Sequence, residues 1–221
     1  MNDIVNYFSN SDPTNVSTSV KLLLLLTVLS LAPSILILMT SFARIVIVLS
    51  FVRTALATQQ MPPNQVIVGL ALFLTFFIMA PTFQEVNKEA LQPLFAEEIG
   101  LEEAYEKASV PFKEFMSKQT RQKDLDLFLQ YNQAEKPASV EEIPLTMLVP
   151  AFALSEIKTA FQIGFMIFIP FLVIDMIVAS TLMSMGMMML PPVMISLPFK
   201  ILLFVLVDGW YLVMKSLLQS F

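Results

Sequence analysis

The chain has 221 residues, of which 56% are hydrophobic and only 14% are charged, and its mean hydropathy is +0.73. Soluble domains carry about 25% charged residues, so the composition is typical of a membrane protein. The absence of cysteine and histidine excludes disulfides, zinc sites with Cys or His ligands, His-ligated haem and any His general base.

The charged residues are concentrated between two apolar halves. Residues 84–143 hold 13 of the 18 acidic residues and 7 of the 13 basic residues. We therefore predict an all-α fold of membrane-associated helical hairpins, in which two hydrophobic hairpins flank a polar insert. The predicted parts are a polar lead-in (1–20), a first hydrophobic helical hairpin (21–83), a polar, acidic helical insert (84–147) and a second hydrophobic helical hairpin (148–221) with a Met-rich tip (183–192).

The first hydrophobic hairpin begins with an apolar run of 21 residues, 22–42, which is long enough to cross a bilayer core of about 30 Å. A lysine before a leucine-rich stretch also resembles a signal peptide, but the run is longer than usual and Pro33 makes a poor cleavage context. We interpret the segment as retained. Pro62 and Pro63 are expected to begin the second helix of the hairpin, which is expected to bend or end near Pro81.

The insert contains an apolar stripe at helical spacing. Residues 111–131 place apolar side chains at i, i+3 and i+4 and charged side chains on the other face, which predicts one amphipathic helix. Residues 133–143 are interpreted as a linker.

The second hydrophobic hairpin is expected to start near Pro150 and to run as one helix to Met185. Gly186 permits a tight bend, and Pro191 and Pro192 interrupt a helix, so these three residues are predicted to form the hairpin tip. One final helix is expected after them.

Seven charged residues interrupt the apolar sequence, and each would cost about 2.5–3.5 kcal/mol at the centre of a bilayer. We expect either that they pair between subunits or that the helices do not lie in lipid as simple spans. For Arg53 and Lys158 a second interpretation is open: they mark the ends of membrane spans, where long side chains reach water. For Asp175, Lys200 and Asp208 we favour buried pairing. The complete set is Arg44, Arg53, Glu156, Lys158, Asp175, Lys200 and Asp208.

The stretch "MSMGMMMLPP" at residues 183–192 places five methionines around one glycine. Three interpretations compete: an apolar turn against lipid, a Cu(I) site of thioether ligands, and a deformable seal. Methionine is flexible and polarizable, and a hydrophobic constriction excludes water and ions by dewetting. The seal requires several copies around an axis.

No catalytic motif is evident. HExxH, GxSxG and P-loop patterns are absent from the sequence. Asp175 and Asp208 lie on different expected helices, as an intramembrane aspartyl protease would require, but they lack the sequence contexts of that family. We therefore expect neither catalysis nor a cofactor.

Two long segments resemble a known family. They are "FARIVIVLSFVRTALATQQMPPNQVIVGLALFLTFFIMAP" (Phe42–Pro81) and "LVPAFALSEIKTAFQIGFMIFIPFLVIDMIVASTLMSMGMMMLPPVMISLPFKILLFVLVDGWYL" (Leu148–Leu212). They are similar to the FliP family of flagellar biosynthesis proteins, which includes the equivalent subunits of virulence-associated type III secretion systems. The end of the chain is closer to the flagellar branch.

The resemblance implies a non-enzymatic core subunit of a protein-export gate in the bacterial cell membrane, at the flagellar basal body. Several copies would form a ring or cone with FliR and FliQ, associated with FlhB. Unfolded flagellar subunits would pass through it, with membrane lipid around it and no nucleic acid involved. The insert would then face the non-cytoplasmic side.

The resemblance also implies roles for particular residues. Met187, Met188 and Met189 match the methionine gasket of the family. Glu156, Lys158, Asp175 and Lys200 lie within shared motifs, and we predict that they make polar contacts between subunits.

Overall fold

The computed structural model describes residues 23, 26–27, 30–31, 33–58, 60–134, 137, 139–187 and 189–221. The chain divides into two compact units, residues 1–37 and 38–221. The described residues of the first unit are helical. The predicted lead-in at residues 1–20 and Met188 of the predicted gasket lie outside the described residues. All that follows concerns the second unit.

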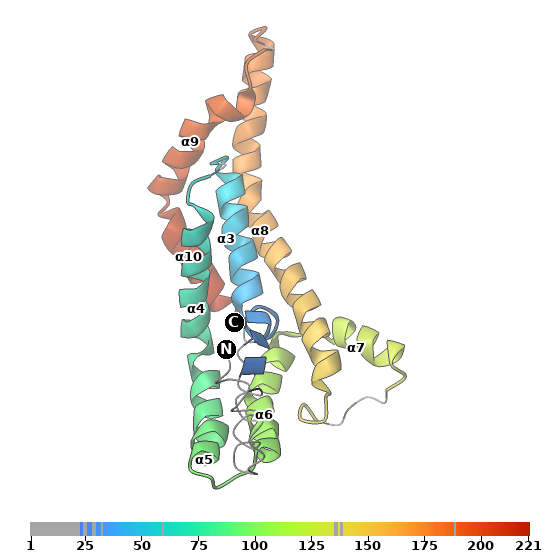
Figure 1. Ribbon diagram of the computed structural model, residues 1–221. Helices are drawn as coiled ribbons and strands as arrows, with labels where there is room; N and C mark the ends of the chain where they lie inside the picture. Colours follow the sequence, from blue (N-terminus) through green and yellow to red (C-terminus); the bar gives the residue numbers. More distant parts are fainter. Residues whose placement is uncertain are drawn as a thin grey trace, which may run out of the picture. The chain divides into compact units, whose positions relative to one another are not determined.

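Where the chain is described, it is helical and contains no strand, which confirms the all-α prediction. Figure 1 shows two long hairpins rising from a group of shorter helices. The elements are α3 (Phe42–Ala55), α4 (Asn64–Val86), a π-helical segment (Asn87–Leu91), α5 (Gln92–Phe95), α6 (Leu101–Gln119), α7 (Gln122–Tyr131), α8 (Leu145–Ser184), α9 (Pro192–Leu206) and α10 (Gly209–Gln219).

The first hairpin consists of α3 and α4. Helix α4 begins directly after Pro63 and contains Pro81 in its interior. The helix does not end at Pro81, because it continues to Val86 and on through the π-helical segment; the expected bend there stays a prediction. Buried Met79, Thr82 and Val86 flank the proline, and such tertiary packing holds a helix together where one backbone hydrogen bond is missing.

The second hairpin consists of α8 and α9. Helix α8 starts at Leu145, not near Pro150, because Met147 and Leu148 are buried before that proline and hold the first turn in place. Its 40 residues extend about 60 Å at 1.5 Å per residue. The expected single final helix is also wrong: α9 and α10 are separated by a bend of 64°, at which Asp208 has a φ of 51°.

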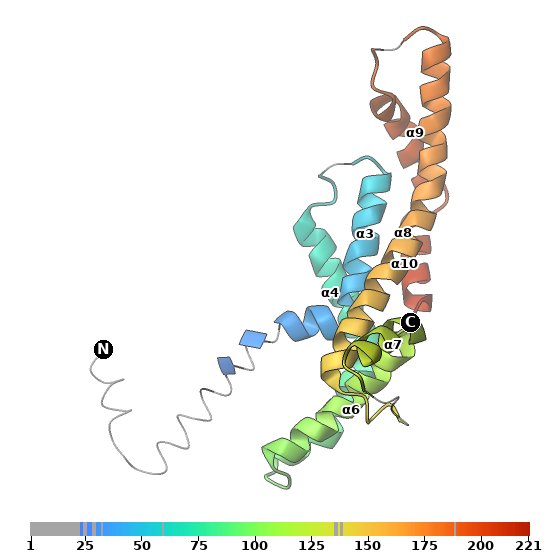
Figure 2. The same cartoon turned by 90° about the vertical axis from the view of Figure 1, so that its right-hand side faces the viewer.

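Helix α3 lies between the two long helices and forms the core with them. Its residues Ile45, Val48 and Val52 are fully buried. On α8, Gly164 permits close approach: a Cβ at this position would lie 2.5 Å from the ring of Phe51. Figure 2, turned by 90°, shows α8 on the near side of α3 and α4 behind it.

The expected single helix at residues 111–131 is wrong as well. The chain forms α6 and α7, which are separated by extended backbone at Thr120 and Arg121, and Pro111 lies inside α6. The break allows the start of α7 to contact α8, as described below.

Two helical segments are long and apolar enough to cross a membrane, namely Asn64–Phe95 and Leu145–Ser184. The number rises to four if each of two bent helix pairs counts as one span.

Candidate functional site

The candidate site has three parts: two buried polar clusters that join the helices, and the Met-rich tip between α8 and α9. The first cluster is centred on Arg44 of α3. Its guanidinium donates to both carboxylate oxygens of Glu156 on α8, with 3.0 Å from Nε to Oε2. The two residues are 1% and 0% exposed. Such a bidentate pair combines charge neutralisation with a defined geometry.

Arg44 also binds the end of α10 and the end of α6. Its Nη1 donates to the backbone carbonyl of Ser220, and its Nη2 donates to Oε1 of Gln119 over 3.0 Å. The ring of Phe221 lies 3.9 Å from the Arg44 Cζ, within cation–π range. We call these five residues (Arg44, Gln119, Glu156, Ser220 and Phe221) the Arg44 cluster.

The residue next to Glu156 joins α7 to the same helix. The Ser155 hydroxyl donates to Oδ2 of Asp124 over 2.6 Å, and the backbone N–H of Arg121 donates to the Ser155 Oγ over 3.1 Å. Arg121 also pairs with Asp124. Two consecutive residues of α8 therefore bind two different elements: Ser155 binds the start of α7, and Glu156 binds Arg44 of α3, which in turn binds the end of the chain.

The second cluster joins α8 to α9. Lys200 Nζ lies 2.6 Å from Oδ2 of Asp175, and the Ser196 hydroxyl donates to the other carboxylate oxygen. Lys200 is 2% exposed, whereas Asp175 is 28% exposed. Asp175, Ser196 and Lys200 are called the Asp175 cluster below.

The remaining predicted charges lie elsewhere. Arg53 is half-buried and donates to Oδ1 of Asn64 and to the carbonyl of Pro62. Lys158 is exposed on α8, and Asp208 is exposed at the bend between α9 and α10. This chain alone does not bury Asp208, so its buried pairing stays a prediction. Glu156, Asp175 and Lys200 have partners within the chain, and their contacts with other subunits also stay a prediction.

The Met-rich tip projects away from both clusters (Figure 1). Helix α8 ends at Ser184, Gly186 has a φ of 76°, and α9 begins at Pro192 after Pro191. Met187 is 41% exposed and Met189 is 98% exposed. The tip thus presents apolar side chains to the outside, Met189 almost completely and Met187 in part.

Sequence reasoning identified the charges of both clusters but missed their hydrogen-bonding partners. These partners carry no motif: they are Gln119, Ser196 and Ser220. Ser220 is 176 residues from Arg44, to which it binds. Among the described residues, no group of three or more Asp and Glu side chains is arranged to hold a metal ion.

Known proteins match nearly the whole chain. A sequence model of the FliP family matches residues 25–217. A protein of Bacillus subtilis named flagellar biosynthetic protein FliP is 77% identical over 221 residues, which cover 100% of both chains. Proteins of the same name from Aquifex aeolicus and Caulobacter vibrioides are 54% and 56% identical, over 94% and 91% of this chain and 87% and 76% of their own.

Proposed function

Because the chain belongs to the FliP family, we propose that it is a core subunit of the flagellar type III protein-export gate. Several copies would assemble with FliQ and FliR, in association with FlhB, in the cell membrane at the flagellar basal body. Unfolded flagellar subunits would cross the membrane through the shared channel. The role is structural and not catalytic. The observation that carries the proposal is the 77% identity to a relative named for flagellar biosynthesis over the full length of both chains.

The length of α8 supports a gate that extends beyond the bilayer. Its 40 residues span about 60 Å, which is twice the thickness of a hydrocarbon core of about 30 Å. An untilted α8 therefore projects well outside the lipid. Polar groups on the projecting part do not need to be sheltered from lipid, and at a level inside the lipid the pairing of Glu156 with Arg44 or of Asp175 with Lys200 neutralises the charges.

The exposed tip supports a seal. Methionine side chains have three rotatable bonds and polarizable sulfur, so several tips around one axis would close on each other without a unique fit. The apolar constriction that they form would exclude water and ions by dewetting. In this proposal Met187, Met188 and Met189 are the gasket, and Gly186 with Pro191 and Pro192 positions it. The flagellar branch is favoured over the virulence-associated one by the names of the relatives.

The export role is tested by complementation. In a Bacillus subtilis strain without its own FliP, expression of the chain is expected to restore swimming and the release of hook and filament subunits into the medium. The Arg44→Ala variant, whose fold is expected to be destabilised, shows what a loss of folding alone does to swimming and release. A membrane-inserted chain that restores neither swimming nor release would contradict the proposal.

The seal is tested by combining Met187→Ala, Met188→Ala and Met189→Ala. We expect the assembled gate with this triple variant to conduct small ions when reconstituted in vesicles, because alanine is too short to close the constriction. Met183→Ala, Met185→Ala and Met194→Ala form a matched control, since these three methionines are exposed on either side of the gasket. Equal leakage from wild type, triple variant and control would show that the gasket assignment is wrong.

A further inference from the structure

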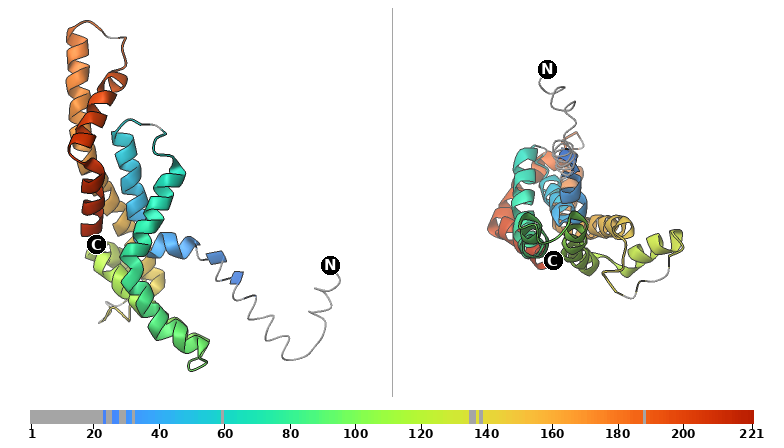
Figure 3. Two further views of the ribbon diagram at one scale, coloured as in Figure 1. Left: turned by 90° about the vertical axis from the view of Figure 1, so that its left-hand side faces the viewer. Right: turned by 60° about the horizontal axis from the view of Figure 1, so that its bottom comes forward.

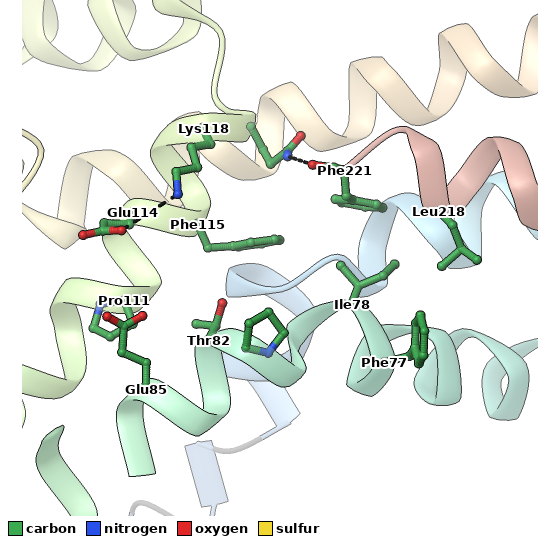
Figure 4. A pocket seen from close by; sticks show the side chains of 12 residues that line it. Phe77, Ile78, Thr82, Glu85, Pro111, Glu114, Phe115, Lys118, Leu218 and Phe221 are labelled. Carbon is green, nitrogen blue, oxygen red and sulfur yellow. Dashed lines mark hydrogen bonds and ion pairs between the residues drawn. The ribbon is translucent and has the colours of Figure 1, made fainter. Parts of the chain in front are cut away.

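A cleft of about 520 Å³ lies between α4, α6 and the end of the chain. Its volume falls within the usual range of ligand pockets, about 300–1,000 Å³. Figure 4 shows Phe77, Ile78, Leu218 and Phe221 at one end and charged side chains at the other. The cleft is therefore apolar with a polar edge.

The polar edge carries an excess of negative charge. Glu114 and Lys118 form an ion pair of 3.9 Å, whereas Glu85 has no ion-pair partner within the part of the chain that the structure describes. All three side chains are exposed. The cleft therefore suits an apolar occupant that brings one positive charge.

The opposite face of the molecule offers such an occupant. Leu154, Lys158, Phe161 and Phe165 follow one another at helical spacing on α8 and are all exposed, so they form one stripe. Lys158 has no ion-pair partner among the described residues. It lies two residues, or about 200°, from the buried Glu156 and is therefore turned away from Arg44, although Phe161 of the same stripe packs against Phe51 of α3 with ring centroids 5.2 Å apart.

The Arg44 cluster links the α8 turn next to the stripe to the apolar end of the cleft. Glu156 binds Arg44, which binds Gln119, and Gln119 in turn binds the carbonyl of Phe221. Gln119 and Phe221 also line the cleft. The Arg44 cluster therefore joins the cleft to the part of α8 that carries Lys158. Figures 2 and 3 place α8 and α4 on opposite sides of α3.

We infer that the cleft of one copy receives the Lys158 stripe of a second copy, with Lys158 paired to Glu85. Two different surfaces on opposite sides make a head-to-tail contact, which closes into a ring when each copy is rotated without being shifted along the axis. The inference rests on the proposed function, which requires several copies, and it names the surfaces through which they meet.

Cross-linking tests the contact directly, because the chain contains no native cysteine. The double variant Lys158→Cys and Glu85→Cys is expressed as the full chain in bacterial membranes and treated with a short bismaleimide. A disulfide is unsuitable, since it cannot bridge Cα atoms more than about 7 Å apart. We expect a ladder of covalent multimers from the double variant and no multimer from either single variant.

The matched control carries Phe165→Cys in place of Lys158→Cys. Phe165 is exposed on the same stripe but lies about 10 Å farther along the helix. It is expected to give no ladder with Glu85→Cys. Charge reversal adds a second readout: Lys158→Glu is expected to weaken assembly about tenfold, and adding Glu85→Lys should restore it.

The possible failures are distinguishable. If wild type forms multi-copy assemblies on native gels but the double variant gives no ladder, or is cross-linked to a different protein, the cleft contact is refuted and the proposed function stands. If wild type forms no multi-copy assembly, the proposed function fails, and the contact fails with it.

Discussion

The Arg44 cluster and the Met-rich tip differ in how completely the chain satisfies its own side chains. At the cluster, Arg44 and Glu156 are buried, and their hydrogen bonds and those of the half-buried Gln119, Ser220 and Phe221 join α3, α6, α8 and the end of the chain. At the tip, Met189 is almost completely exposed and Met187 is 41% exposed. The comparison teaches that the cluster holds the single chain together, whereas the tip is available for contacts with other molecules. Substitutions in the two regions should therefore have different consequences.

The largest effect on stability is expected from Arg44→Ala. It leaves the Glu156 carboxylate buried without its cation, and removing one member of a buried pair destabilises a protein by about 3–5 kcal/mol. Denaturant unfolding in detergent measures the loss. Lys123→Ala removes an exposed cation of α7 that the inferred contact between copies does not use, and it is the control, expected to change stability by less than about 0.5 kcal/mol. Equal losses from both variants would show that the cluster does not hold the chain together.

A smaller loss is expected from Asp175→Ala. Lys200 would remain almost fully buried without its partner, but Asp175 itself is partly exposed, so water would solvate the freed ammonium in part. We expect a loss of about 2–3 kcal/mol in the same unfolding measurement. We also expect co-purification with FliR to be lost. Unaltered co-purification would argue against a role of this cluster in assembly.

Gly164→Ala is expected to have a still smaller effect. The added methyl group would lie 2.5 Å from the Phe51 ring, and overpacking of this kind costs about 1–3 kcal/mol. Gly69→Ala is the control, because nothing lies within 4 Å of its added Cβ. A midpoint of thermal unfolding that does not fall for Gly164→Ala relative to Gly69→Ala would contradict the close packing of α3 on α8.

The smallest effect on stability is expected at the tip. Met187→Ala combined with Met189→Ala removes exposed side chains with few intramolecular contacts, so the free energy of unfolding should change by less than about 0.5 kcal/mol. If this double variant is destabilised as much as Arg44→Ala, the tip is part of the folded core and does not differ from the Arg44 cluster in its contribution to stability.

Local pattern was sufficient for some of the fold and insufficient for the rest. The apolar runs and the prolines located the hairpins approximately, because an apolar run marks a buried or membrane-capable helix and a proline marks a position where a helix tends to begin or end. The break between α6 and α7 carries no comparable local signal: it lies at Thr120 and Arg121, where no proline or glycine stands. Its reason is distant, since the Arg121 backbone and Asp124 bind Ser155 on α8.

The amino-acid sequence by itself determined that this is an all-helical chain with membrane-capable segments and a Met-rich turn. Composition, apolar run length and helix-breaking residues act locally and need no knowledge of distant partners. Only the tertiary structure decided which charges meet. Arg44 pairs with Glu156 across 112 residues, while Lys158, two positions away, remains exposed. The physical reason is the rotation of about 200° that two residues make around a helix, which turns one charge inward and the other outward.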